Sequence, residues 1–468
     1  MRHSIKKIFV VIVLCSGIAI NGFAQDMRSG YFLQSSTFRH QINPALLDQT
    51  YFSALFGNVN AGATGNVGLK DFVYKTTGNA NYDLTTFMNP NISTSEFLGN
   101  INNKNRVNVS LNYNLASTAF KAFGGFNVVE MNLRSYTSLC LPYELFDFMK
   151  EAGAKEHYTL KDLGARSKSY IELALGHSHK INENWTVGGK VKMLFGLAYA
   201  DLDVNSMDIT MNSNQWIINT DAKIKSAILS SKFKYSDRED PKNTKQGMKK
   251  VNGLDDVSFG IPGFGLAMDL GAVYKMPNVE GLTLSASLTD LGFISWSKTS
   301  TGASEGSYTF DGFKNPIYVN GHNDGTNKLS DQSDALKDDL EKMFSVYDQG
   351  QKSTTTALAA TFNLGAEYVM PFYDKLSGGF LLTDRFDGLY SWHQGMLSAN
   401  VRPLNWLDCS LNTALSTTGW TCGGMLSLHS SHFNFYVGAD HFMGQVSKQF
   451  IPLNNMNENI CLGFTFPL

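Results

Sequence analysis

The segment RVNVSLNYNL, residues 106–115, alternates apolar and polar side chains almost without exception. Its apolar positions are Val107, Val109, Leu111, Tyr113 and Leu115. A period of two predicts a β-strand with one apolar and one polar face. A soluble sandwich would bury the apolar face against a second sheet, whereas a membrane barrel would turn it to lipid and leave the asparagines along a wet lumen. The choice between these folds limits what the chain can do.

The N-terminus has the pattern of a secretory signal peptide. Three basic residues precede an apolar run over 8–20, and Gly22 and Ala24 are small residues suited to a cleavage site. The apolar run is shorter than the roughly 20 residues that a membrane-spanning helix needs. We therefore expect residues 1–24 to direct export and to be removed.

The remainder of the sequence favours strands over helices as membrane-crossing elements. It contains no run of eighteen apolar residues, so a helical crossing is excluded. Of all residues 17% are charged and 43% hydrophobic, a mixture that suits alternating strands. The formal charge of −2 becomes −5 once the three bases of the signal are removed, which does not favour nucleic-acid binding. The cysteines beyond the signal form no CxxC pair and are expected mostly unpaired: Cys140, Cys409, Cys422 and Cys461.

Strand-like runs recur from residue 51 to the C-terminus, and many have ten residues or more. Strands of globular domains average about five or six residues, whereas membrane-crossing strands need about nine to eleven. Five of the six tryptophans fall near expected strand ends, where barrels carry aromatic girdles. The last segment, NENICLGFTFPL, is typical of the C-terminal signal of outer-membrane barrels, which implies a barrel assembly machinery as partner; a soluble edge strand is the alternative. Its apolar face comprises Ile460, Leu462, Phe464, Phe466 and Leu468.

Polar insertions interrupt the strands without indicating a second domain. Residues 227–257 are expected to form a solvated loop, and residues 314–353 a loop with a short amphipathic helix. Pro142 and Gly153 suit the start and end of another short helix. Residues 25–50 are irregular and either cap one end of a barrel or enter its lumen as a hatch. Residues 51–468 are expected to form the barrel itself.

Signatures of an enzyme are missing from the sequence. There is no G-x-S-x-G, H-E-x-x-H, P-loop or G-x-G-x-x-G motif. His177 and His179 share one face of an expected strand, but no cysteine or carboxylate pattern accompanies them, so we interpret them as lumen or rim residues. We therefore expect no catalytic residue, no metal and no cofactor.

Three stretches resemble an uncharacterised family of Bacteroidota outer-membrane proteins: INPAL at 42–46, YIELALGHSHKINENWTVGGKVKMLFGLA at 170–198 and LTLSASLTDLGFISW at 282–296. That family is similar to the long-chain fatty-acid transporters and to barrel proteins that accompany type IX secretion. The resemblance implies a barrel of about fourteen strands with an N-terminal hatch, whose Asn-Pro-Ala element corresponds to Asn43, Pro44 and Ala45.

These observations together predict an all-β protein, a transmembrane antiparallel β-barrel in the outer membrane, in contact with its lipid. Val107, Val109, Leu111, Tyr113 and Leu115 are then expected to face that lipid, because a closed barrel pairs every backbone group without an exposed edge. The leading functional hypothesis is passive passage of a small hydrophobic molecule through a plugged barrel. The alternative is a non-enzymatic scaffold or shuttle that docks secreted proteins at the cell surface.

Overall fold

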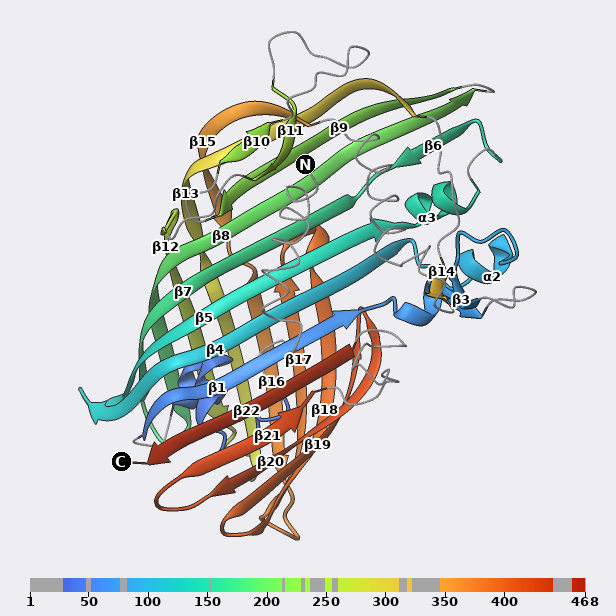
Figure 1. The fold of residues 1–468 in the computed structure, drawn as a ribbon. Coiled ribbons are helices and arrows are strands. Elements are labelled where there is room, and N and C mark those ends of the chain that lie inside the picture. The colour runs from blue at the N-terminus through green and yellow to red at the C-terminus, as the bar shows by residue number, and fades with distance from the viewer. Residues whose placement is uncertain are drawn as a thin grey trace.

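The computed structural model describes residues 28–47, 52–75, 82–151, 154–212, 215–228, 232–235, 249–254, 260–310, 318–321, 346–440 and 457–467. Within these ranges the main sheet closes into an antiparallel barrel, because β1 pairs with β4 on one edge and with β22 on the other (Figure 1). The prediction of an all-β barrel of about fourteen strands is confirmed.

Fourteen strands make up the ring and follow one another around it in chain order. They are β1 (Phe52–Gly65), β4 (Lys104–Ala122), β5 (Gly125–Pro142), β7 (Leu163–Lys180), β8 (Trp185–Asn212), β12 (Gly263–Lys275), β13 (Leu282–Phe310), β16 (Ala360–Val369), β17 (Leu376–Phe386), β18 (Trp392–Leu404), β19 (Leu407–Ser416), β20 (Gly419–His429), β21 (Asn434–Ala439) and β22 (Asn457–Pro467).

Two ring strands are much longer than the others and continue above the barrel. β8 has 28 residues and β13 has 29, so each is about 90 Å long at roughly 3.3 Å per residue. Their lower parts flank β12, and their upper parts flank β9 (Gln215–Ile228). β6 (His157–Leu160) pairs with β8 and β15 (Tyr347–Ala357) with β13 at the same upper level. We call these paired upper parts the upper wall.

β13 changes its partner where its backbone is irregular. Below this point it pairs with β16, and above it with β15. Asp290 has a φ of 59°, a left-handed value that is uncommon for a residue other than glycine, and its backbone N–H donates to Asp269 Oδ1 at 2.7 Å. The side chain of Asp269 therefore satisfies a backbone group that the bulge removes from the ladder.

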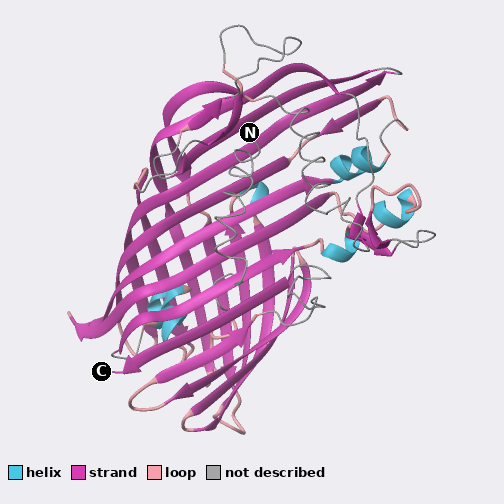
Figure 2. Ribbon diagram, in the orientation of Figure 1, coloured by secondary structure: helices cyan, strands magenta, loops and turns pink. Residues whose placement is uncertain are grey.

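Small elements gather beside one end of the barrel (Figure 2). They are η3 (Leu69–Asp71), β2 (Val73–Lys75), β3 (Tyr82–Thr86), α2 (Thr94–Leu98), α3 (Tyr143–Lys150) and β14 (Tyr318–Gly321). Phe87, Phe97 and Phe146 fill their common core. Lys150 fastens α3 to the chain after β3, since its Nζ donates to the carbonyls of Phe87 and Asn89 at 2.8 and 2.9 Å, and burial lowers its pKa.

The insertions differ in part from the expectation. The helix expected after Pro142 forms as α3, which ends at Lys150. The expectation of a simple solvated loop over 227–257 is wrong in its described part, because β10 (Phe233–Tyr235) and β11 (Val251–Leu254) pair there, and Phe233 and Leu254 are buried against Ala198 and Ile228. The amphipathic helix expected within 314–353 falls in 322–345, outside the described residues.

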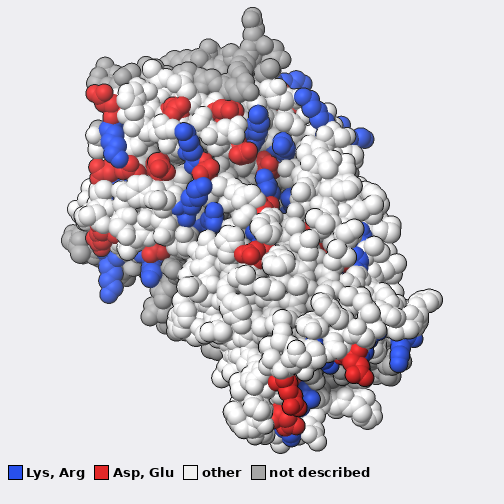
Figure 3. Space-filling model, turned by 180° about the vertical axis from the view of Figure 1, so that it is seen from behind, with Lys and Arg blue, Asp and Glu red and all other residues white. Residues whose placement is uncertain are grey.

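The outer surface has an uncharged belt below a charged region. Figure 3 shows Lys, Arg, Asp and Glu side chains over the upper part of one face and near its lower tip, with few between them. Large apolar side chains point outward in the belt, including Val191 at 62% exposure, Leu270 at 52% and Leu411 at 66%. None of the helices in the described part of the chain is long and apolar enough to cross a membrane.

Candidate functional site

The N-terminal segment, residues 28–47, lies among inward-facing side chains of the ring. It forms turns and two short 3-10 helices, η1 (Thr37–Gln41) and η2 (Pro44–Leu46), and all its residues except Gln34, Ser35 and Leu46 are buried. Its apolar side chains pack against the wall in two clusters. One joins Leu33 and Phe38 to Phe52, Met425 and Tyr436, and the other joins Tyr31, Phe32 and Ile42 to Leu381 and Met396.

Asn43 is hydrogen-bonded both within the segment and to the barrel wall. Its side chain caps η2 by accepting a hydrogen bond from the Ala45 backbone N–H at 3.0 Å, and Pro44 occupies the first helical position, where no donor is needed. Its Nδ2 donates to Tyr31 Oη at 3.1 Å and to the Ala286 carbonyl at 3.3 Å. One fully buried side chain thus fixes the local turn and joins it to the barrel wall.

Two glycines of the wall make room for the same turn. A Cβ on Gly188 of β8 would lie 2.4 Å from the Pro44 carbonyl carbon, and a Cβ on Gly271 of β12 would lie 2.1 Å from Asn43 Oδ1. Both distances are far below van der Waals contact, so any larger residue would displace the segment. The structure therefore brings the Asn-Pro-Ala element against wall positions that the sequence did not single out.

A charged group joins η1 to β5 and β8 of the wall. His40 Nε2 lies 3.3 Å from Glu130 Oε2, and Gln41 Nε2 donates to the same oxygen at 3.0 Å. Lys190 Nζ donates to Glu130 Oε1 at 2.5 Å. Glu130 therefore has both carboxylate oxygens occupied, one by the N-terminal segment and one by β8, as a charge buried from solvent requires.

A second buried ionic cluster lies beside the first and belongs to the wall alone. Lys192 Nζ is 2.7 Å from Asp290 Oδ1, 2.8 Å from Asp269 Oδ2 and 3.5 Å from Glu172 Oε2. Arg134 Nη2 lies 3.6 Å from Glu172 Oε1, and the Lys192 and Glu172 side chains are at most 1% exposed. At this level two cations lie among three carboxylates, so each buried charge has a partner of opposite sign.

The lumen above this layer contains aromatic residues and a loop that crosses it. Trp296 is fully buried and stacks on Tyr199 with ring centroids 5.3 Å apart. The connection from β17 to β18 contains η4 (Gly388–Tyr390) and contacts strands on the far side of the ring, where Arg166 Nη1 lies 3.2 Å from Asp387 Oδ1 and Arg106 Nη1 donates to the Ser391 carbonyl at 3.0 Å. We call residues 387–391 the crossing loop.

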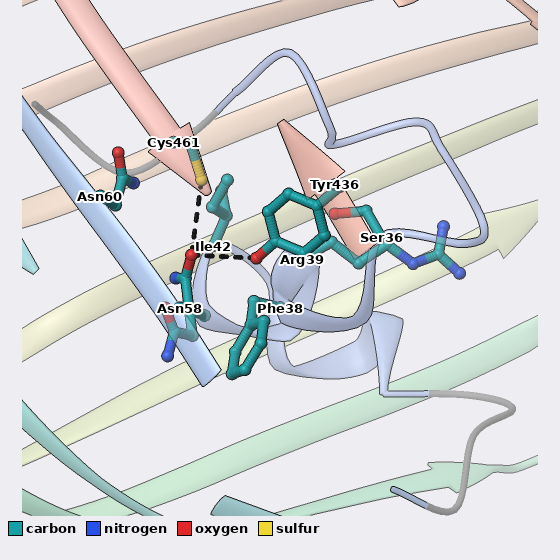
Figure 4. A pocket seen from close by; sticks show the side chains of 9 residues that line it. Ser36, Phe38, Arg39, Ile42, Asn58, Asn60, Tyr436 and Cys461 are labelled. Carbon is teal, nitrogen blue, oxygen red and sulfur yellow. Dashed lines mark hydrogen bonds between the residues drawn. The ribbon is translucent and has the colours of Figure 1, made fainter. Parts of the chain in front are cut away.

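Two small cavities lie next to the N-terminal segment. Figure 4 shows the first, of about 20 Å³, where Asn58 Oδ1 accepts from Tyr436 Oη at 2.9 Å and from Cys461 Sγ at 3.4 Å. It has room for about one water, which suits the buried Asn60 Oδ1 that has no partner among the described residues. The second, of about 30 Å³, lies between Arg28 of the segment, Arg385, and the crossing loop.

The apolar residues 107–115 of β4 are partly exposed, while their polar neighbours turn inward. Val107, Val109, Leu111, Tyr113 and Leu115 are neither buried nor fully exposed. Asn112 and Asn114 are at most 3% exposed, and their side-chain nitrogens donate to Gln41 Oε1 at 3.1 Å and to Asn132 Oδ1 at 2.8 Å. The polar face of this strand therefore contacts the N-terminal segment.

The C-terminal strand alternates in the same sense. Ile460, Leu462 and Phe466 are 51%, 45% and 49% exposed, and Phe464 stacks on Phe433. Leu468 lies outside the described residues. Cys461, between two of the outward residues, is buried, and it and the other three described cysteines are free thiols.

The expectation that tryptophans near strand ends belong to aromatic girdles is correct only in part. Trp185, Trp406 and Trp420 are 42% to 57% exposed near strand ends, as a girdle requires. Trp296 and Trp392 are wrong as girdle residues, because they point inward and are 0% and 6% exposed. Proximity to a strand end does not reveal which face a side chain takes.

His177 and His179 lie away from the lumen. Their rings stack with centroids 5.9 Å apart, and His177 Nδ1 is hydrogen-bonded to Asn127 Oδ1 at 2.9 Å. His179 is exposed. Among the residues that the structure describes, no group of three or more His, Cys, Asp or Glu side chains is arranged to hold a metal ion.

The sequence analysis did not predict the ionic clusters of the lumen. The signal was present in GGKVKMLF, where Lys190 and Lys192 alternate with Val191 and Met193, so both lysines had to share the polar face of one strand. Their partners come from β5, β7, β12 and β13, and only the ring order brings these strands together.

The fold and this interior define a class: a closed fourteen-stranded β-barrel with buried ion pairs among its inward-facing side chains. Residues 44–440 match the family of unknown function DUF5723, so the chain belongs to that family. Among curated proteins, none matches the sequence significantly.

Solved outer-membrane barrels resemble the chain over most of its length, but weakly. The toluene transporter TbuX of Ralstonia pickettii has a TM-score of 0.39 at 8% identity, covering 92% of this chain and 93% of its own. The P. putida toluene transporter TodX has 0.37 at 9%, covering 95% of both chains. The translocator domain of the autotransporter NalP from Neisseria meningitidis has 0.31 at 8%, covering 90% and 89%. Similarity at this level carries no information on function.

Proposed function

We propose that this protein is an outer-membrane β-barrel through which a small hydrophobic molecule passes when residues 28–47 move. One observation carries the proposal: these residues are buried inside the ring and bonded to it by His40, Gln41 and Asn43. The uncharged outer belt supports a membrane location, with residues 1–24 as the export signal. By the usual orientation of such barrels, the short turns, such as the one between Ala122 and Gly125, face the periplasm.

The hydrophobic nature of the cargo rests on the resemblance to the fatty-acid transporters. The buried ion pairs around Glu130 and Lys192 leave no continuous apolar path, so passage requires the N-terminal segment to shift and the charges to rearrange. The energy for passage would come from the concentration difference of the solute, without a bound cofactor.

A reversible cross-link tests the movement. Thr37 Oγ1 of the segment and Thr465 Oγ1 of β22 are 3.2 Å apart, so cysteines at both positions can form a disulfide. Ser135 Oγ and Ser169 Oγ of β5 and β7 are 2.8 Å apart and provide a matched control that joins only wall strands. Both pairs are placed in a background whose native cysteines are alanines, and solute uptake into proteoliposomes is measured.

Oxidation of Thr37→Cys/Thr465→Cys should reduce uptake of a small hydrophobic probe, and reduction should restore it. Oxidation of Ser135→Cys/Ser169→Cys should change nothing. Undiminished uptake through the oxidised Thr37–Thr465 pair would rule out passage by movement of the segment. Uptake of a polar probe of the same size in place of the hydrophobic one would correct the cargo class and keep the mechanism.

The upper wall favours a second candidate, a scaffold that docks secreted proteins. β8, β9 and β13 rise above the uncharged belt and carry exposed polar residues such as Asp203, Asn205 and Lys223. Replacing residues 322–345 by a short Gly-Ser linker should abolish co-purification of a secreted partner under this hypothesis. Persistence of the complex would exclude these residues as the docking element.

A further inference from the structure

The second cavity joins the N-terminal segment, the wall and the crossing loop. Arg28 enters it from the segment and Arg385 from β17, while Asp387 lines it from the crossing loop. Neighbouring positions of β4 and β5 complete the lining, since Asn108 pairs with Ser138 in the ladder and Ser110 lies one step further on the same inward face. Three parts of the molecule that are distant in sequence therefore meet at one small space.

Both guanidinium groups are held flat by aromatic rings. The Arg28 guanidinium carbon lies 4.6 Å from the Trp392 ring centroid, and that of Arg385 lies 4.5 Å from the Tyr136 centroid. Stacking of this kind fixes the plane of a guanidinium, in which its N–H groups lie. The two cations are thus positioned before any ligand arrives.

Donors in this cavity outnumber acceptors. Among the residues that the structure describes, the Arg385 side chain donates no hydrogen bond, although a guanidinium has five N–H donors. Asn108 Nδ2 is buried and also without a partner within the described chain. Asp387 is the only carboxylate of the lining, and it already lies 3.2 Å from Arg166 Nη1. The lining of this space therefore has two cationic side chains against one carboxylate, and it has unused donors on Arg385 and Asn108.

We propose that this cavity binds an oxyanion, a phosphate, sulfonate or carboxylate group, between Arg28 and Arg385. Its volume of about 30 Å³ is the room of about two or three waters, which suits a single oxyanion group and excludes a whole hydrophobic molecule. Arginine N–H groups match the geometry of such an anion, and Asn108, Ser110 and Ser138 provide neutral donors. The anion is either a free solute or the head group of a molecule with an apolar tail.

A role of this cavity in holding the head group of a transported molecule rests on the proposed function. Binding of an anion to the cavity does not require transport. Because Arg28 belongs to the N-terminal segment and Arg385 to the wall, a bound anion joins the two. Anion binding and the position of the segment are then linked, so each affects the other by the same factor.

Calorimetric titration of the full mature chain in phosphate-free detergent tests the site. Inorganic phosphate should bind saturably at one site per barrel, and Arg385→Gln should weaken the affinity by about tenfold or more. Lys352→Gln is the charge control, because Lys352 is an exposed residue of β15 outside the lining of the cavity, so its loss should leave phosphate affinity unchanged. Asn108→Leu removes one donor at similar volume, and should weaken binding even if Arg385→Gln fails to fold.

Hexyl phosphate separates the two sources of the anion. An affinity similar to that of inorganic phosphate indicates a free anion, and a markedly higher affinity that Arg385→Gln still lowers indicates a head group. Absence of saturable binding of both compounds to the folded wild-type barrel would overturn the proposal, as would equal affinities in Arg385→Gln and wild type. Titration is done on the closed barrel, so its outcome is independent of the uptake measurements that test the proposed function.

Discussion

The lower and upper parts of β8 both turn polar residues toward the lumen, but their apolar faces have different surroundings. In the lower part Val191 and Met193 point outward and are 62% and 43% exposed, while Lys190 and Lys192 are buried inside. In the upper part Asp201 is bonded to Arg166 in the lumen, and Val204 lies on the opposite face. Val204, Met207 and Ile209 are buried there in one cluster with Phe148 of α3 and Leu160 of β6. A strand that has lipid outside can leave its apolar face uncovered, and a strand that has water outside needs that face covered by protein. The start of this cover along one strand marks where the proposed membrane ends.

A backbone irregularity separates the two parts of β8. The register of β7 and β8 shifts between Ser169 and Tyr170, so that Leu197 of β8 has no partner opposite it in β7. β8 also changes its other neighbour here, from β12 up to Gly196 to β9 from Ala198 onward. Because of this extra residue, the inward-facing set changes from even-numbered residues such as Lys192 to odd-numbered residues such as Asp201, so polar side chains still face the lumen.

Removal of the Lys192 ammonium from the lumen should cause the largest loss of stability among the substitutions proposed. Lys192→Met would leave Glu172, Asp269 and Asp290 close together without the ammonium they share, which should cost about 3–5 kcal/mol. Lys223→Met, at an exposed position of the upper wall, should change the free energy of unfolding by less than about 0.5 kcal/mol. Urea unfolding in lipid vesicles measures both, and equal effects would show that the lumen network is not needed for stability.

A charge added to the outer surface distinguishes the two halves directly. Val191→Arg should cost about 2–4 kcal/mol if this position lies near the middle of the bilayer. Asn205→Arg introduces the same charge 14 positions along β8 on an exposed residue bonded to Asp221, and should be nearly neutral. The same unfolding assay applies, and equal tolerance at the two sites would contradict the membrane boundary drawn here.

Two adjacent glycines in the lower part of β8 allow its inward and outward faces to be compared. A Cβ on Gly188 would collide with Pro44 and Ala45, whereas a Cβ on Gly189 would be 3.6 Å or more from its neighbours. Gly188→Val should therefore cost about 1–3 kcal/mol through overpacking and raise the conductance by displacing the N-terminal segment. Gly189→Val should leave the conductance unchanged. A closed Gly188→Val barrel would show that the turn at Pro44 does not control the lumen.

Much of the barrel could be predicted from local pattern, and the lumen could not. Alternation in 106–115 and 460–466 indicates strands with one apolar face, and both segments are strands whose polar or small residues turn inward. The same period-two rule cannot tell that Trp296 lies inside, because the bulge at Asp290 is set by tertiary contacts with Asp269. Nor does it pair Lys192 with carboxylates from three other strands, since these meet only when the ring closes.

Conductance of the barrel without its N-terminal segment tests the central claim most directly. A chain lacking residues 25–50 would be assembled into planar bilayers and compared with the full mature chain, with folding checked by resistance to denaturant. If this segment closes the lumen, the deletion should remain a folded barrel and conduct far more current than the nearly closed full chain. A folded deletion with the same low conductance would contradict the account, because the lumen would then be closed by the wall residues and the crossing loop alone.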